Sequence, residues 1–470
     1  MPPPPFPSRI EPIKCPAFAI SWLGPTCYND ASTLAYGGGG GSARTGISNS
    51  ITVVSLPPSS SPPLPPPPKT LDVLPPPLIS PSNSHKIDTG DQICVGMDML
   101  HYGPKVEDIR LLAAIGMEIR LYSATTGTLL ACTRVDNDGA NVVALRPGGE
   151  ACVVGCENGR VLLYHIRKAP SSNSTETETE TETETTEKNL PFQFQPVATA
   201  DGHFQSTSIK KGVCSITYSP HPHLILSSAR DGTARVWDAH NGAPLATLTC
   251  SITDPQAPPP PPSKPKPKRP SPILVRGCAF GPTDQRIYTC QSGRKGRAYC
   301  SLWKLAPSNA SSDGPPVYTE VERRCVSPTP VSSMSMSGDQ STVTFGNVEG
   351  SIFVYTAENL MLRTRFEDIH DLPVTCMAAQ PLGQKDGIFG AISASADNKL
   401  AFLSERTLPR SYRRWMFWIM VWIIMGVLGK KMYEECQEEI GQWDMGGLQV
   451  CVQHSIFAPP TRPGISFVPH

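Results

Sequence analysis

Short runs of Val, Ile, Leu and Tyr, separated by turn residues, recur along most of the chain. Each group holds two or three strand-like runs, and turn pairs such as Asn158-Gly159 and Asp231-Gly232 separate them. No amphipathic helix of ordinary length competes with this pattern before residue 405. Units of roughly forty residues with several strands each are typical of a β-propeller. The pattern therefore predicts an all-β, seven-bladed propeller, with blades at residues 17–53, 111–122, 142–166, 213–248, 278–305, 331–355 and 374–403.

Polar segments interrupt this pattern and are expected to be disordered loop insertions within one domain. Two are proline-rich tracts, and another contains the acidic run TETETETETETTE, which has no apolar residue to bury. The predicted insertions lie at about residues 57–90, 168–190, 252–272 and 306–317. The predicted plan of the chain is a disordered N-terminus at 1–13, the propeller at 14–404, a membrane anchor helix with basic flanks at 405–431, and a tail at 432–470.

Charge and cysteine content narrow the function classes. The 41 acidic and 41 basic side chains give a formal net charge of zero, which offers no electrostatic basis for nucleic-acid binding. The basic run at residues 264–269 raises DNA binding as an alternative, but a basic proline-rich linker is usually just solvated. The 15 cysteines form no CxxC pair, so we interpret most of them as small buried hydrophobic residues in a reducing compartment.

The fourth unit gives the clearest motif. Gly202-His203 precedes GVCSITYSPHPHLILSSARDGTARVWDAHNGAPLATL, which resembles a complete WD-type blade. The resemblance assigns four residues to a structural hydrogen-bond network rather than to catalysis: His203, Ser228, Asp231 and Trp237. Propellers of this type usually serve as rigid binding platforms, so we expect a binding protein and not an enzyme.

Residues 415–429, WMFWIMVWIIMGVLG, are uncharged and strongly apolar. As a helix they would extend about 22 Å, short of the ~30 Å hydrocarbon core, so a buried helix or an interfacial segment is an alternative. Two features favour a membrane span ending near Gly429: the aromatic residues Trp415, Trp418 and Trp422, and basic flanks on both sides. The larger number of arginines before the segment places the propeller in the cytosol and residues 432–470 in a lumen, where Cys436 and Cys451 could pair.

A run of five glycines, residues 37–41, lies between two strand-like runs within residues 34–53. Glycine allows the backbone to approach a phosphate, an ion or another protein closely, although a flexible hairpin tip is the simpler alternative. A P-loop or a dinucleotide fingerprint would lead into a helix. Here the run leads into a strand, so we do not expect this protein to bind a nucleotide itself.

The propeller, the C-terminal anchor and the glycine loop together resemble one family. It comprises the endoplasmic-reticulum membrane guanine-nucleotide exchange factors for the Sar-type small GTPase of COPII coats, the prolactin regulatory element-binding protein-like family. The family loop has a glycine run, a few small or polar residues, and then Gly-Ile-Pro-Asn before a strand. Residues 37–41, 42–45, 46–49 and 50–53 fill these places in order, with Ser48 where the family usually has proline. Loss of that proline lowers the rigidity of the loop.

The resemblance implies a function and a site. The protein would sit in the endoplasmic reticulum membrane and promote GDP release from the GTPase, which starts COPII assembly in ER-to-Golgi transport, without covalent chemistry. Backbone carbonyls would bind potassium at Gly38, Gly39, Gly40, Gly41, Ser42 and Thr45, and the GTPase would contact Gly46, Ile47, Ser48 and Asn49. The alternative is a membrane-tethered scaffold that binds coat or trafficking proteins and has no exchange activity.

Overall fold

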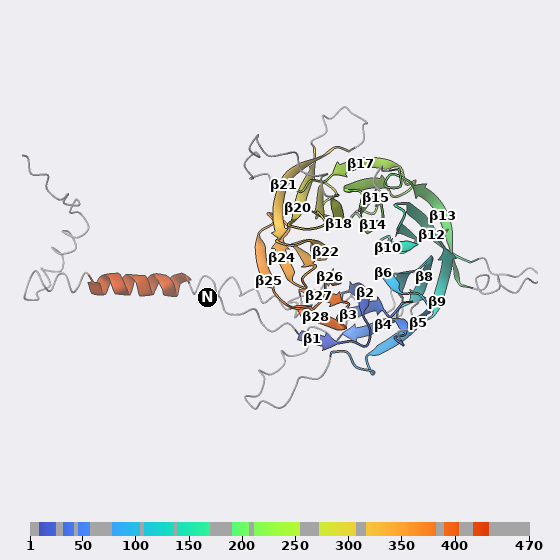
Figure 1. Ribbon diagram of the computed structural model, residues 1–470, viewed down its shortest axis with the longest axis horizontal. Helices are drawn as coiled ribbons and strands as arrows, with labels where there is room; N and C mark the ends of the chain where they lie inside the picture. Colours follow the sequence, from blue (N-terminus) through green and yellow to red (C-terminus); the bar gives the residue numbers. More distant parts are fainter. Residues whose placement is uncertain are drawn as a thin grey trace, which may run out of the picture. The chain divides into compact units, whose positions relative to one another are not determined.

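The computed structural model describes residues 9–24, 32–41, 46–56, 78–103, 108–135, 139–169, 190–205, 211–253, 272–306, 316–381, 390–403 and 417–431. It divides into two units, residues 1–405 and 406–470, which are considered separately. In the first unit, seven four-stranded antiparallel sheets surround a common centre (Figure 1). The prediction of a seven-bladed β-propeller is therefore confirmed.

Six of the seven sheets run from an inner strand to an outer strand in chain order. Blade 1 contains β2 (Ala17–Leu23), β3 (Ser32–Gly38), β4 (Asn49–Leu56) and β5 (Ser84–Gly90). Blade 2 contains β6 (Cys94–His101), β7 (Ile109–Ile115), β8 (Glu118–Ser123) and β9 (Leu129–Arg134). Blade 3 contains β10 (Ala140–Leu145), β11 (Ala151–Cys156), β12 (Val161–Lys168) and β13 (Phe192–Ala200). Blade 4 contains β14 (Val213–Tyr218), β15 (Leu224–Ala229), β16 (Thr233–Asp238) and β17 (Pro244–Thr249).

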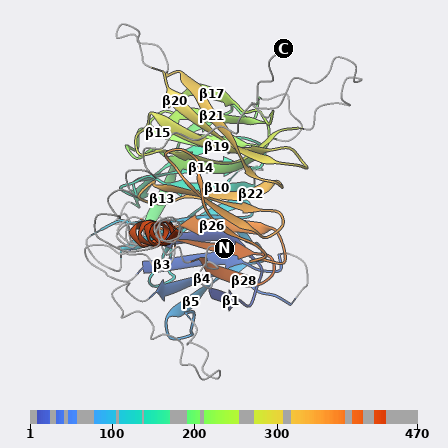
Figure 2. The ribbon, with the colours of Figure 1, turned by 90° about the vertical axis from the view of Figure 1, so that its left-hand side faces the viewer.

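The remaining blades have the same four-stranded arrangement, and Figure 2 shows the ribbon turned by 90°. Blade 5 contains β18 (Leu274–Phe280), β19 (Arg286–Ser292), β20 (Ala298–Leu305) and β21 (Tyr318–Ser327). Blade 6 contains β22 (Val331–Met336), β23 (Thr342–Asn347), β24 (Ile352–Thr356) and β25 (Leu362–Phe366). Blade 7 contains β26 (Val374–Ala379), β27 (Ala391–Ser395) and β28 (Lys399–Leu403), with β1 (Arg9–Pro12) as its outer strand.

The ring is closed by the two ends of the propeller segment. β1 pairs antiparallel with β28, with Arg9 opposite Phe402 and Pro12 opposite Lys399. The expectation that residues 1–13 are a disordered N-terminus is therefore wrong for residues 9–12. The proline is tolerated because β1 is an edge strand, where a missing N–H removes no bond within the sheet. A further correction concerns residues 84–90, which we expected in an insertion but which form the outer strand of blade 1.

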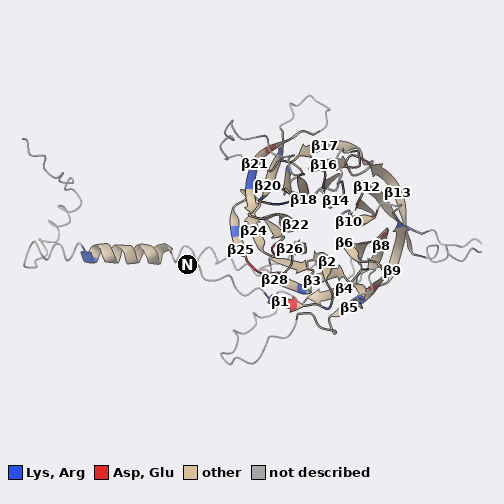
Figure 3. Cartoon of the chain, in the orientation of Figure 1, with Lys and Arg blue, Asp and Glu red and all other residues tan. Residues whose placement is uncertain are grey.

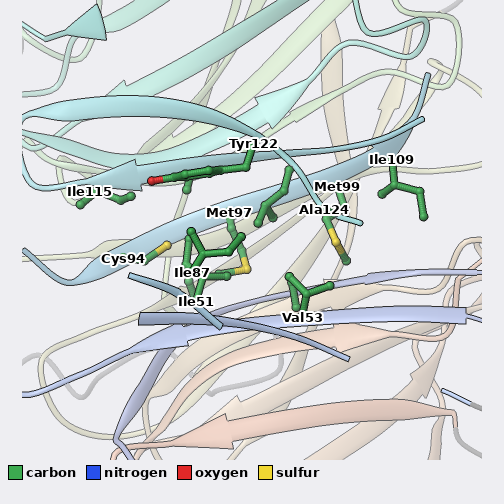
Figure 4. Packing of buried hydrophobic residues seen from close by; sticks show 14 residues of the cluster. Ile51, Val53, Ile87, Cys94, Met97, Met99, Ile109, Ile115, Tyr122 and Ala124 are labelled. Atoms are coloured by element: carbon green, nitrogen blue, oxygen red, sulfur yellow. The ribbon is translucent and has the colours of Figure 1, made fainter. Parts of the chain in front are cut away.

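Apolar side chains fill the spaces between neighbouring blades. Among the described residues, seven buried clusters correspond to the seven blade interfaces, including the closing interface between blades 7 and 1. Figure 4 shows the interface between blades 1 and 2, where Ile51, Val53 and Ile87 face Met97 and Ile115. Because each sheet buries both faces, the strands carry the near-continuous apolar runs from which the blades were predicted.

The described cysteines belong to this core. None of these twelve described cysteines forms a disulfide, and eight of them are buried. Burial raises the pKa of the thiols of Cys94, Cys250 and Cys278 to about 12 each. These cysteines therefore remain protonated and pack as small apolar residues, as the sequence predicted. Cys436 and Cys451 lie outside the described residues.

One buried cation also contributes to the packing. The Arg110 guanidinium carbon lies 3.3 Å from the ring centre of Tyr102 and 4.3 Å from that of Phe192. The same guanidinium donates a hydrogen bond to the Gly149 carbonyl. It therefore ties blade 2 to blade 3 through stacking and a charge-assisted hydrogen bond. Elsewhere, charges of both signs lie around the ring (Figure 3).

Candidate functional site

The glycine run forms the end of β3 and the start of the connection to β4. Glycine is required there by close packing. An added Cβ at Gly38 would lie 1.7 Å from the Pro16 carbonyl oxygen, and one at Gly39 would lie 2.2 Å from Asn49 Oδ1. Gly39 and Gly41 also have positive φ angles of 149° and 74°, which disfavour residues with a side chain. The neighbouring strands and the backbone shape therefore account for these glycines.

Asn49, the first residue of β4, fixes the base of this loop. Its Oδ1 accepts a hydrogen bond from the Gly41 amide (2.9 Å), and its Nδ2 donates to the carbonyls of Gly41 (3.2 Å) and Gly90 (2.9 Å). The residue is only 4% exposed. The expectation that Asn49 is presented to a partner is therefore wrong, because its amide group is used inside the protein. Asn49 therefore holds the loop from inside the protein.

The other predicted contact residues are exposed. Gly46 has a φ of 74°, and Ile47 and Ser48 follow it on the surface, with Ile47 37% exposed. Ile47 lies only two residues before Asn49, whose side chain makes three hydrogen bonds. The position of Ile47 is therefore restricted by the short segment that joins it to Asn49. Ser42 and Thr45 lie outside the described residues.

Some of the potassium ligands implied by the resemblance are better placed to bind an ion than others. Gly38 lies within the sheet, in register with Ala17 on one side and Ser50 on the other. Its carbonyl is therefore poorly placed for an ion. Gly39, Gly40 and Gly41 follow the end of the strand, and the positive φ angles turn the backbone there. The Gly41 carbonyl already accepts a hydrogen bond from Asn49, which leaves one lone pair for a cation.

The loop shares one face of the propeller with other connections. Because neighbouring strands are antiparallel, the β3–β4 loop, the β5–β6 connection and the β7–β8 turn all lie at the same end of their blades. We call this end the loop face. The β5–β6 connection supports the loop directly, since the Cβ position of Gly41 lies 3.3 Å from Ile93 Cδ1. The Gly90 carbonyl is bonded to Asn49, so the loop is attached to this connection at both ends.

The predicted network in blade 4 forms with one change of residue. His203 Nδ1 lies 3.1 Å from Asp231 Oδ2, and His203 Nε2 lies 2.9 Å from Ser227 Oγ. Trp237 Nε1 donates to the same Ser227 oxygen at 2.8 Å. Among the described residues, the network therefore runs through Ser227, and the prediction of Ser228 is wrong. Successive strand residues point to opposite faces of a sheet, so an offset of one places the hydroxyl on the other side.

Burial sets the charge state of this network. Burial lowers the pKa of His203, and the Asp231 carboxylate only partly offsets that effect. Burial raises the pKa of Asp231, but the hydrogen bond and electrostatic interaction with His203, together with the hydrogen bonds from Thr233, outweigh this effect and lower the pKa. A neutral imidazole donating from Nδ1 to Asp231 and accepting at Nε2 from Ser227 satisfies all three groups. The side chains are fully buried, so this arrangement supports the fold and not a reaction.

A second network of the same kind lies in blade 7 and was missed from the sequence. His370 Nδ1 lies 3.1 Å from Asp397 Oδ2, and His370 Nε2 lies 2.9 Å from Ser393 Oγ. The signal was present, because AISASADNKLAFL (391–403) repeats the spacing of ILSSARDGTARVW (225–237). Leu403 stands where blade 4 has tryptophan, and this substitution hid the repeat.

Residues 417–431 form a helix in the second unit. Trp418, Trp422 and Gly429 are exposed on it, with Trp422 76% exposed, while Trp415 lies outside the described residues. Large apolar side chains are exposed along most of its length. Within the described part of the chain, no helix is long and apolar enough to cross a membrane. The membrane anchor stays a prediction.

Comparisons with known proteins agree with the fold. The family model described as "WD domain, G-beta repeat" matches residues 194–238, which include β14, β15 and β16 and the His203 network. The β-propeller domain of Cps50 (Swd1) from Myceliophteria thermophila is similar over 85% of this chain and 100% of its own, with 9% identity and a TM-score of 0.55. A chain of the mitotic checkpoint complex covers 85% of this chain and 91% of its own, at 12% identity and a TM-score of 0.53. No curated protein sequence matches the chain.

Proposed function

We propose that this protein is a guanine-nucleotide exchange factor for a Sar-type small GTPase, and that it acts from the endoplasmic reticulum membrane at the start of COPII assembly. The observation that carries the proposal is the braced loop of blade 1. Asn49 fixes its base, and Ile47 is exposed on the loop. The order of residues from 37 to 53 supports it, because it resembles the loop of that exchange-factor family.

The proposed mechanism uses binding alone. An exchange factor accelerates GDP release if it binds the nucleotide-free GTPase more tightly than the nucleotide-bound form. A loop base held by hydrogen bonds suits this task, because the residues that Asn49 holds lose little conformational entropy on binding. Ile47 would enter an apolar site on the GTPase and displace the switch loops that hold the phosphates and magnesium. No side chain of this protein has to form or break a bond.

A potassium ion would complete the loop by drawing together the carbonyls of residues 39–41 with oxygens from residues 42 and 45. Hard cations bind oxygen ligands, and a glycine-rich backbone allows several carbonyls to converge. In this proposal Asn49 holds the Gly41 peptide in place whether or not the ion is bound. Hydrogen exchange of the loop amides in potassium and in sodium buffers would test the ion directly.

The helix at 417–431 supports membrane attachment. It exposes tryptophan, isoleucine, methionine and leucine side chains, and Lys430 and Lys431 end it. Such a surface is strongly driven out of water, and lysines at its end can reach the headgroup region. We propose that lipid covers this helix and that the propeller lies in the cytosol.

The deciding experiment measures GDP release from a Sar-type GTPase mixed with the full chain in detergent micelles. We expect acceleration by the wild-type protein and about a tenfold loss with Ile47→Ala, since a central apolar anchor typically contributes more than 1 kcal/mol. Ile10→Ala is the matched control, because Ile10 is also an exposed isoleucine, on the outer strand β1. No acceleration by wild type, or equal rates for the wild-type and Ile47→Ala proteins, would rule out the proposal.

A scaffold without exchange activity is the second candidate. The outer strand β21 favours it, because Val317 and Val321 are exposed beside and on this strand, away from the loop. Apolar side chains on a strand edge suit binding of an extended peptide. Recovery of coat subunits, but not of nucleotide-free GTPase, in pull-down experiments would favour this candidate.

A further inference from the structure

Two residues hold the Gly41 peptide. Asn49 bonds its polar groups, accepting from the Gly41 amide and donating to the Gly41 carbonyl. Ile93 packs on its apolar part, because an added Cβ at Gly41 would lie 3.3 Å from Ile93 Cδ1 and 3.8 Å from Ile93 Cγ1. Apart from the chain neighbours of Gly41, no other described residue comes within 4 Å of that position. Ile93 therefore fills the space that a side chain at Gly41 would occupy.

The turn that carries Ile93 is itself held in place. Thr89 is 1% exposed, and its Oγ1 donates a hydrogen bond to the Gln92 carbonyl (2.8 Å), which closes the turn. Gly90 has a φ of 74°, and its amide donates to Asp88 Oδ1 at 2.9 Å. The Gly90 carbonyl accepts from Asn49 Nδ2. The position of Ile93 relative to the loop is therefore determined by hydrogen bonds on the turn that precedes it.

Ile93 contributes little to the propeller core. It is half-buried, and among the described residues it belongs to none of the seven buried clusters. Blade 5 has a similar contact, since the Cβ position of Gly293 in the β19–β20 turn lies 3.4 Å from Ile252 Cδ1. Such packing by itself only supports a turn. Ile93 differs in what it supports, because Gly41 precedes the segment that carries the exposed Ile47.

We infer that Ile93 is a positioning residue for nucleotide exchange and acts through Gly41. This inference rests on the proposed function and adds a residue that the loop motif does not contain. Ile93 and Asn49 hold one end of the segment at Gly41, and Asn49 itself is the other end, two residues after Ile47. Fixing both ends of a short segment limits the conformations of the residues between them. Ile47 therefore loses less conformational entropy when it binds the GTPase.

The test combines two measurements on the full chain in detergent micelles: GDP release from the GTPase, and hydrogen exchange of the Gly41 amide. Ile93→Ala removes both atoms that approach Gly41, whereas Ile93→Val removes Cδ1 and keeps Cγ1. We expect the acceleration of GDP release to fall about fivefold with Ile93→Ala and less than about twofold with Ile93→Val. The Gly41 amide should exchange faster in Ile93→Ala, and the Leu34 amide, in the same strand β3, should exchange as in wild type.

Ile252→Ala is the matched control. It removes the same atoms from another half-buried isoleucine that packs on a glycine, in the connection after β17. GDP release and exchange of the Gly41 amide should both remain as in wild type. If Ile252→Ala lowers GDP release as much as Ile93→Ala, the effect is not specific to the blade 1 loop and the inference fails.

The remaining outcomes separate this inference from the proposed function. If wild type accelerates GDP release and Ile93→Ala does so equally well, Ile93 is not a positioning residue while the proposed function stands. If Ile93→Ala speeds exchange of the Leu34 and Gly41 amides alike, the substitution acts on the whole blade, and the inference also fails. If wild type does not accelerate GDP release, the proposed function and this inference fail together.

Discussion

The three hydrogen bonds of the Asn49 side chain lead to a prediction that distinguishes a structural role of this residue from direct contact with the GTPase. Asn49→Ala removes three hydrogen bonds and leaves the Gly41 amide and two carbonyls without their partner. Each hydrogen bond contributes about 0.5–1.5 kcal/mol net, so we expect the free energy of unfolding to fall by about 3 kcal/mol. Asn49→Asp should be at least as destabilising, because a carboxylate oxygen would face the Gly41 and Gly90 carbonyls.

The effect is measurable by thermal and denaturant unfolding. The propeller unit spans residues 1–405. At about 2.1 cal/mol/K per residue its unfolding entropy is about 0.85 kcal/mol/K, so a loss of about 3 kcal/mol lowers the midpoint by about 4 °C. Ser48→Ala is the control, because Ser48 is the exposed neighbour of Asn49 and should leave the midpoint unchanged. Faster hydrogen exchange at the Gly41 amide in Asn49→Ala would locate the change in the loop.

One combination of results would refute the structural role of Asn49. If Asn49→Ala unfolds within about 0.5 kcal/mol of wild type and still loses GTPase binding, the side chain acts in contact and the buried geometry is not the bound one. If stability and binding fall together, and exchange of the Gly41 amide rises, the loop needs Asn49 to hold Ile47 in position.

Three further predictions concern the fold. Trp237→Phe removes the indole donor to Ser227 and should destabilise the propeller by about 1 kcal/mol in urea unfolding, whereas an unchanged midpoint would show that the bond contributes nothing. Burial lowers the pKa of His203 and His370, so the folded state binds fewer protons than the unfolded state below the unfolded pKa of about 6.5. The contribution of the two histidines to the free energy of unfolding is therefore constant above about pH 6.5 and decreases as the pH falls from there towards the folded pKa. Unfolding would be measured at successive pH values, and a free energy of unfolding that rose on acidification would contradict this prediction. Arg110→Lys keeps the charge but loses the planar stack between two aromatic rings, and it should lower the free energy of unfolding by about 1–2 kcal/mol in the same assay.

The repeated strands were predictable from the sequence because each blade buries both faces of its sheet, which requires runs of apolar residues in the strands. β1 was not predictable, since RIEP has only four residues, includes a proline and carries no periodic signal. Its strand identity comes from pairing with β28, almost four hundred residues away in sequence. That contact is non-local, and no pattern within residues 9–12 encodes it.

The site was only partly predictable for a related reason. The order of residues from 37 to 49 identifies a loop, but it does not say which way a side chain points. Asn49 turns inward because the amide and carbonyls of Gly41 and Gly90 need a partner at that position. Ser227 and Ser228 are adjacent hydroxyls, and only the strand register decides which one meets His203.

The glycines have to be reinterpreted once the packing is known. A glycine run alone suggests that a ligand approaches the backbone, yet the neighbours of Gly38 and Gly39 are Pro16 and Asn49 of the protein itself. Those two glycines are therefore explained without any ion or partner. What remains for a function is the segment beyond the strand: the turned backbone at Gly41 and Gly46, and the exposed Ile47 that they carry. In the proposed function, the exposed side chain at position 47, rather than the number of glycines, determines which partner binds.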